Sequence, residues 1–93
     1  MTQHEKILRC MVAHPGGITI RDGMMLGINW PHKRIAELEE QGVQVDRIDT
    51  EKDGTRFRLY RLRPGQDRVK QLMDGYRRAR DDAWRKKQSA GAD

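Results

Sequence analysis

The side chains best suited to molecular recognition gather at the start of one stretch, Gly27 to Gly42 (GINWPHKRIAELEEQG). Asparagine can bond adenine and arginine can bond guanine through two hydrogen bonds, whereas lysine suits phosphates. Trp30 can stack on a base or brace the turn, and bracing is favoured. Arg34 borders an apolar seam, so it either contacts a ligand or pairs with a neighbouring side chain. The candidate contact residues here are Asn29, Trp30, His32, Lys33 and Arg34.

These residues must be positioned by a helix, and the stretch carries the signals of one. Asn29 is a favourable N-cap, Pro31 falls in the first turn, where its missing N–H costs nothing, and Gly42 supplies a left-handed stop. Ile35 and Leu38 continue an apolar face from Pro31 at helical spacing. The carboxylates of the carboxyl-terminal half keep that half away from phosphates: Glu37, Glu39 and Glu40.

A second, shorter helix is expected just upstream. Thr19 and Asp22 have the spacing of a capping box and open a segment from Ile20 to Leu26 that ends at Gly27. Two short helices that meet at a glycine-containing turn form a helix-turn-helix. Its inner surface is expected to consist of Met24, Met25, Leu26 and Ile28.

The chain begins with another capping-box pattern, Thr2 to Glu5, which predicts a first helix over residues 3–14. Pro15-Gly16-Gly17 ends it, and the β-branched run Ile18 to Ile20 predicts a few residues of edge strand. The inward face of the first helix is expected to hold Ile7, Leu8, Met11 and Val12.

After Gly42 the pattern alternates with period two, and Asp53-Gly54 is a strong hairpin turn signal. We therefore expect a β-hairpin, a wing, with its second strand over residues 55–62. The pattern leaves open whether the Phe57 side or the Tyr60 side of that strand is buried. Near the turn, Arg56 and Arg58 are expected to reach a phosphate backbone, and near the body lie Arg61 and Arg63.

Pro64-Gly65 marks a boundary between a domain over residues 1–63 and a basic helix with a frayed tail over residues 64–93. Two arrangements of this helix remain open: it packs on the domain, or residues 66–87 pair with a second copy. Its cations either contact phosphates or form a solvated face. Its apolar seam is Val69, Leu72, Met73, Tyr76, Ala79, Ala83 and Trp84, and the frayed tail is Gln88 to Asp93.

The charge of the chain favours a polyanionic partner. Its net charge is +5 and its pI about 9.8. The excess of Lys and Arg over Asp and Glu is 0 in residues 1–42, +2 in residues 43–63 and +3 in residues 64–93. The single cysteine excludes an internal disulfide, and no apolar run is long enough to cross a membrane. A soluble cytoplasmic protein is expected.

Catalytic signals are weak. Cys10 and His14 stand four apart without a second metal-binding pair, and a calcium-like loop from Asp49 fails at Tyr60, where a glutamate would be needed. No hydrolase, metalloprotease or phosphate-loop motif is present. We expect no enzyme activity, no metal or other cofactor, no small-molecule substrate and no membrane partner.

Several of these motifs together resemble the small winged helix-turn-helix domains of bacteriophages and prophages. The matching positions are Gly16 to Thr19, Leu26 to Ile28, Arg34, Ile35, Leu38, Gly42, and Tyr60 to Leu62, within residues 5–62. The resemblance implies an α+β fold of three helices and a β-hairpin wing, here with an additional carboxyl-terminal helix. It also implies double-stranded DNA as the partner and a sequence-specific transcriptional regulator. The alternatives are an accessory factor in recombination or packaging and a module that binds a host or phage protein.

Overall fold

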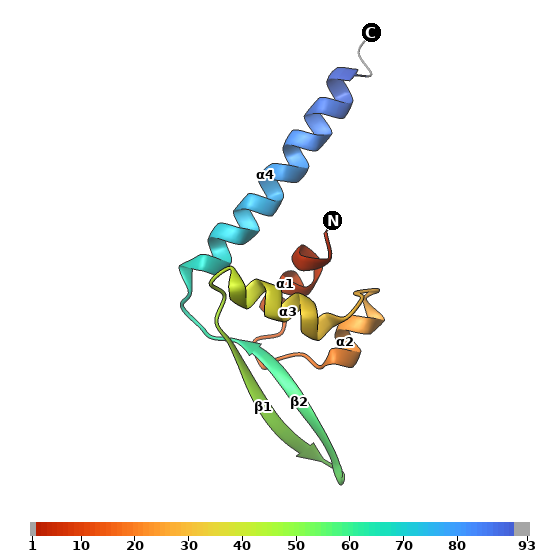
Figure 1. The fold of residues 1–93 in the computed structure, drawn as a ribbon, viewed down its shortest axis with the longest axis vertical. Coiled ribbons are helices and arrows are strands. Elements are labelled where there is room, and N and C mark those ends of the chain that lie inside the picture. Colours follow the sequence, from red (N-terminus) through yellow and green to blue (C-terminus); the bar gives the residue numbers. More distant parts are fainter. Residues whose placement is uncertain (1, 91–93) are drawn as a thin grey trace.

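Over residues 2–90, four helices and one two-stranded antiparallel hairpin form the molecule (Figure 1). This computed structural model describes those residues, with side chains through residue 87. The α+β class is confirmed, and the arrangement is compatible with a small winged-helix-like fold. The elements are α1 (Gln3–Ala13), α2 (Ile20–Met25), α3 (Pro31–Glu40), β1 (Val45–Lys52), β2 (Thr55–Leu62) and α4 (Asp67–Ala90).

The core lies where α1, α3 and the base of the hairpin meet. The Thr2 hydroxyl accepts the Glu5 N–H at 3.1 Å and so begins α1, which is one half of the predicted capping box. The Glu5 carboxylate instead contacts Arg9 and Arg80. The expected inward face of α1 is confirmed except for Val12, which is exposed because it points beyond the edge of the core. The buried apolar residues are Ile7, Leu8, Met11, Ile18, Ile28, Ile35, Leu38, Val43, Val45 and Tyr60.

Helix α2 begins with the predicted capping box. The Thr19 N–H donates to the Asp22 carboxylate at 2.9 Å, and the Asp22 N–H donates to the Thr19 hydroxyl at 3.1 Å. Gly23 lies so close to α3 that a Cβ there would stand 2.8 Å from the Pro31 Cβ. The two helices therefore touch through a glycine rather than through large side chains.

This close contact corrects the expected inner surface of the two helices. Ile28 is buried, but Met24, Met25 and Leu26 are each at least half exposed. Because α2 has only six residues and its inward side is Gly23, the three side chains that follow turn outward.

The start of α3 also differs from expectation. Asn29 is not the N-cap: Trp30 occupies that position in the left-handed region, with φ 53° and ψ 62°, and no side chain caps the helix. A residue before proline is disfavoured in the helical region, so Pro31 at the first helical position forces Trp30 out of the helix. The Asn29 N–H instead donates to the side-chain oxygen of Gln3 at 3.1 Å. Pro31, Ile35 and Leu38 are buried, as expected.

Asp53 and Gly54 form the predicted hairpin turn, with φ 52° and 78°. Positive φ at both positions is typical of a type I′ turn, which matches the twist of the paired strands. Tyr60 is buried, so its side of β2 faces the core. Only Ile18 of the expected edge strand pairs with the hairpin, through two backbone hydrogen bonds to Tyr60, because Ile20 already belongs to α2.

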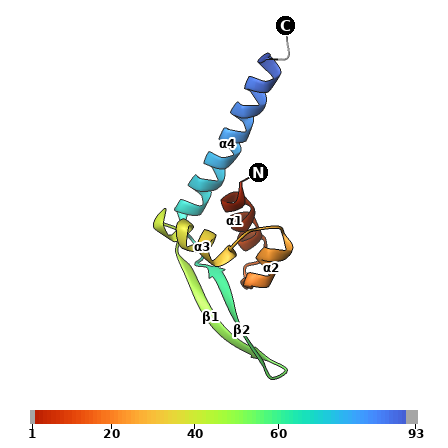
Figure 2. The same ribbon diagram turned by 45° about the vertical axis from the view of Figure 1, so that its right-hand side comes forward.

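Helix α4 packs against the domain over its first half and then leaves it. Val69, Leu72, Met73 and Tyr76 are partly buried against the core. Ala79, Ala83 and Trp84 are exposed, and both views show the helix extending away from the body (Figures 1 and 2). The backbone is helical through Ala90, which includes the first part of the expected frayed tail, and residues 91–93 lie outside the described residues. Within residues 2–90, no helix is both long and apolar enough to span a membrane.

Candidate nucleic-acid interface

Four of the expected contact residues form an exposed edge at the amino-terminal end of α3. Asn29, Trp30, His32 and Lys33 are exposed, while Pro31 between them is buried. The rings of Trp30 and His32 meet edge to face, with centroids 6.2 Å apart. Trp30 is 68% exposed, so the indole contributes little packing to the turn and is available to a partner.

A groove of about 440 Å³ lies beside this edge, between α2 and the start of α3. Its lining is mainly apolar and includes no carboxylate. Met24 stands on the α2 side of the groove, and Trp30 stands on the α3 side. The lining residues are Ile20, Met24, Gly27, Ile28, Asn29, Trp30, Pro31 and His32.

Arg34 is engaged within the protein. Its guanidinium lies 2.9 Å from the Glu37 carboxylate, whose other oxygen is 3.5 Å from His4 of α1. The arginine side chain is mostly covered. The sequence left open whether Arg34 contacts a ligand or pairs with a neighbouring side chain. The structure contains the pairing with Glu37, so contact with a partner requires breaking that ion pair.

Arg56 and Arg58, the two arginines expected to contact phosphates, differ in whether they form an ion pair within the protein. Arg58 donates a hydrogen bond to Asp49 at 2.9 Å, and this bond raises the pKa of the Arg58 guanidinium above its ordinary value. Arg56 is exposed near the turn, opposite Glu51 in the register, and forms no ion pair within the described residues. Arg56 is therefore the more accessible of the two expected phosphate contacts.

The base of the hairpin is fixed to α3 by charged contacts. The Arg47 guanidinium donates two hydrogen bonds to Glu39 and lies over the Tyr60 ring, 5.4 Å from its centroid. The bonds to Glu39 are the main cause of the raised pKa of Arg47. Asp46 contacts Arg61 at 3.6 Å and Arg63 at 2.9 Å, so these two arginines lie near the body, as expected.

The arrangement places the start of α3 and the hairpin tip on the same side of the molecule. In both views the hairpin leaves the body beneath α3, and its tip bends toward the side on which α2 lies (Figures 1 and 2). Two exposed cations in α2 and near the hairpin turn were missed from the sequence: Arg21 and Lys52. Their positions could have indicated them, because Arg21 lies in the first turn of α2 and Lys52 directly precedes the hairpin turn.

The basic residues of α4 lie elsewhere. Helix α4 and the hairpin point in opposite directions, along a molecule whose longest extent is 62 Å (Figure 1). Arg80 contacts Glu5 at 2.9 Å and Arg77 contacts Asp74 at 3.6 Å, so part of this charge is already neutralised. The end of α4 and the hairpin tip therefore cannot meet the same few phosphates.

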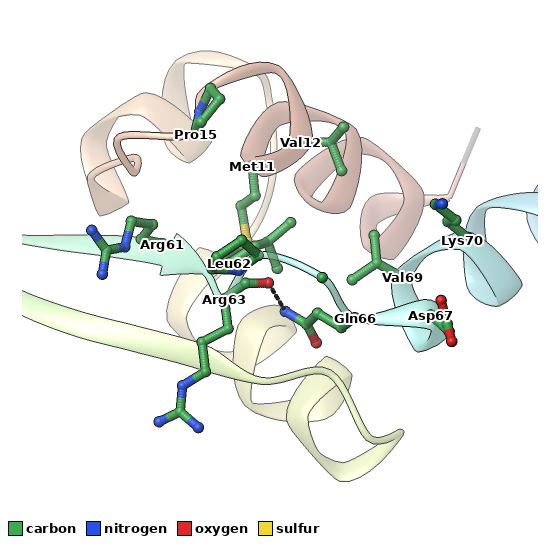
Figure 3. Close-up of a pocket in the computed structure, with 12 residues that line it drawn as sticks. Met11, Val12, Pro15, Arg61, Leu62, Arg63, Gln66, Asp67, Val69 and Lys70 are labelled. Atoms are coloured by element: carbon green, nitrogen blue, oxygen red, sulfur yellow. Dashed lines mark hydrogen bonds between the residues drawn. The ribbon is translucent and has the colours of Figure 1, made fainter.

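A larger groove of about 690 Å³ lies where α1, the end of β2 and the start of α4 meet (Figure 3). Gln66 crosses this junction: its side-chain amide donates to the Arg63 carbonyl at 2.8 Å and to the Gln44 carbonyl at 2.7 Å, and its oxygen accepts the Gln44 N–H at 2.8 Å. These bonds attach the start of α4 to both strands. We therefore assign the polar groups here to holding the junction together.

Cys10 of α1 lies beside His14, the residue at the C-cap of that helix. His14 Nδ1 donates to the Cys10 carbonyl oxygen at 2.8 Å and is 3.9 Å from the Cys10 sulfur. Burial is the main cause that raises the pKa of the Cys10 thiol. Over the residues that the structure describes, no group of three His, Cys, Asp or Glu side chains could hold a metal ion.

No family model, curated protein or solved structure matches the chain.

Proposed function

We propose that this chain is a winged helix-turn-helix protein that binds double-stranded DNA as a small sequence-specific transcriptional regulator. One observation carries the proposal. Asn29, His32 and Lys33 are exposed at the amino-terminal end of α3, and the tip of the hairpin bends toward the side on which α2 lies (Figures 1 and 2). Recognition helices of this class approach the major groove through their amino-terminal residues, so this arrangement suits a helix in the groove and a hairpin beside it.

The proposed contacts divide into two kinds. Lys33 and Arg56, with Arg21 and Lys52 at the margins, bind phosphates and hold the protein in register. Asn29 reads a base edge, since its amide matches the donor and acceptor of adenine. Arg58 can join the phosphate contacts only by leaving Asp49.

A protein-interaction module remains the second candidate because of one observation. Met24, Met25 and Leu26 form a run of three exposed apolar side chains, which is more typical of a protein contact than of a phosphate contact. A role in recombination or packaging would use the same DNA contacts and differs only in what happens after binding.

The test is fluorescence anisotropy of a random-sequence duplex titrated with the protein at several salt concentrations. We expect micromolar or tighter binding at low salt that weakens steeply as salt rises. Lys33→Gln should weaken binding and reduce the salt slope by about 0.9, the amount expected for one lost phosphate contact. Lys87→Gln, near the far end of α4, removes the same charge and should change neither quantity.

Two outcomes would contradict the proposal. Absence of binding at low salt would leave the protein-interaction module as the better explanation. Loss of affinity in Lys87→Gln with none in Lys33→Gln would move the contact surface from α3 to α4.

A further inference from the structure

The groove beside α3 has a lining unlike the cationic edge around it. The two side chains that stand on either side of it, Met24 and Trp30, are apolar and largely exposed. Apolar surface therefore faces solvent around the turn between α2 and α3. This turn precedes the amino-terminal end of α3, the helix that we place in the major groove.

Within that groove of DNA, one base presents an apolar group. Thymine carries a C5-methyl group beside its O4 acceptor, whereas cytosine has only a hydrogen at C5 and the purines present N7 and an exocyclic polar group. Among the base edges of the major groove, this methyl group is the main apolar contact for a side chain at the start of a recognition helix. Arg34, the side chain best suited to guanine, is meanwhile held by Glu37.

Asn29, a polar residue of the groove, suits adenine, the base that pairs with thymine. Asn29 also lines the groove, and its backbone is held by the hydrogen bond from its N–H to Gln3 while its side chain is exposed. An asparagine amide forms two hydrogen bonds with adenine. A methyl-binding surface next to an adenine-binding amide is complementary to an A·T pair.

We infer that the groove between Met24 and Trp30 is a thymine-methyl subsite, and that this protein selects an A·T-containing major-groove sequence through it. The inference rests on the proposed DNA-binding function and states which base the site takes. His32 also lines the subsite and Lys33 follows it in the chain, and no carboxylate lines the subsite to repel the phosphates that flank a base pair.

The experiment removes only the methyl group. A duplex pool with a randomised 20-base-pair segment is selected with the full chain, and the enriched duplex is resynthesised with deoxyuridine in place of thymidine. Deoxyuridine keeps the pairing and the O4 acceptor, so only apolar contact is lost. We expect the dissociation constant to rise about four-fold for each contacted methyl group, the equivalent of one CH2 group left unburied.

Two tryptophan variants test whether the difference between the thymidine and deoxyuridine duplexes arises at this groove. Trp30→Ala should weaken binding to the thymidine duplex and bring the ratio of the two dissociation constants toward one. Trp84→Ala is the matched control: Trp84 is 63% exposed, close to the 68% of Trp30, but lies on the projecting part of α4. It should leave both constants unchanged. Far-UV circular dichroism establishes that both variants are folded, and Met24→Gln should reproduce part of the Trp30→Ala effect.

The failures of the inference and of the proposed function are distinct. Salt-dependent binding with equal dissociation constants for the thymidine and deoxyuridine duplexes overturns the methyl subsite and leaves DNA binding intact. A ratio that persists in Trp30→Ala overturns the assignment to this groove. Absence of binding to every duplex overturns both, and the apolar groove is then a surface for a protein.

Discussion

The buried carboxylate that joins α1 to α4 offers the sharpest test of how the chain holds its last helix. The Glu5 side chain is 2% exposed, and the same carboxylate oxygen contacts Arg9 at 3.0 Å and Arg80 at 2.9 Å. Arg80→Met removes the contact from α4 and keeps the one within α1. Loss of a partner from a fully buried pair costs about 3–5 kcal/mol, whereas an exposed pair contributes about 0–1 kcal/mol.

Arg80→Met should fall between these limits. Arg9 remains beside the carboxylate, and the Arg80 side chain is itself 39% exposed. We expect the free energy of unfolding to fall by about 1–2 kcal/mol, which for a domain of this size lowers Tm by roughly 4–16 °C. Urea denaturation followed by circular dichroism measures it. The matched control is Arg77→Met, whose ion pair with Asp74 is exposed and should contribute within about 0.5 kcal/mol.

A double-mutant cycle then separates the contact from the side chains that form it. Glu5→Gln combined with Arg80→Met should destabilise less than the sum of the two single changes, because each single change already removes the pair. Equal stabilities of Arg80→Met and Arg77→Met, or additive effects in the cycle, would refute the assignment of this carboxylate as the attachment of α4.

Two further predictions concern packing and pH. Gly23→Ala should lower the free energy of unfolding by about 1–3 kcal/mol because its Cβ would overlap Pro31, whereas Gly75→Ala, with open space around the new atom, should raise it by about 0.5–1 kcal/mol. Thermal denaturation compares the pair, and equal shifts would contradict the close α2–α3 contact. Burial, followed by the charge of Glu5, raises the pKa of Tyr76 above 10.0. The resulting stability is fully present below pH 10 and is lost as pH rises through the higher folded-state pKa. Tyr76→Phe should lose less stability than the native chain between pH 9 and 11 in urea titrations followed by circular dichroism, and equal losses would contradict the shift.

The parts of the fold that were predicted correctly depend on signals between neighbours in sequence. The Thr19–Asp22 capping box and the Asp53-Gly54 turn each act within four residues, so they depend little on distant contacts. The apolar side of α3 was likewise readable because Pro31, Ile35 and Leu38 repeat over nearly the whole helix.

The differences from expectation have both distant and local causes. Nothing in the spacing of Met24 reveals that Gly23 allows α3 to approach so closely that large side chains are excluded from the inner surface. The cap of α3 moved from Asn29 to Trp30 because of Pro31, a local effect that asparagine's general preference concealed. The sequence could not decide the position of α4, because this position depends on the contact between Arg80 and Glu5, which lies 75 residues away in the chain.

Within the candidate site, the sequence identified exposed residues correctly, but it did not show which arginines form ion pairs within the protein. Asn29, His32 and Lys33 are exposed as a contact residue must be. Arg34 and Arg58 carry the same charge in the sequence as Arg56, but each lies beside a carboxylate that only the folded chain brings into place or fixes in position.

The backbone at Trp30 has a consequence for how this sequence came to be selected. A left-handed conformation costs a non-glycine residue roughly 1–2 kcal/mol, and glycine adopts it without that cost. An indole that is 68% exposed returns little of this through burial. Selection for a durable fold alone would favour glycine or asparagine here, and a domain of ordinary stability has only about 5–15 kcal/mol in total. Strained residues of this kind cluster at binding sites, so the conformation of Trp30 agrees with the contact surface that we propose at the start of α3.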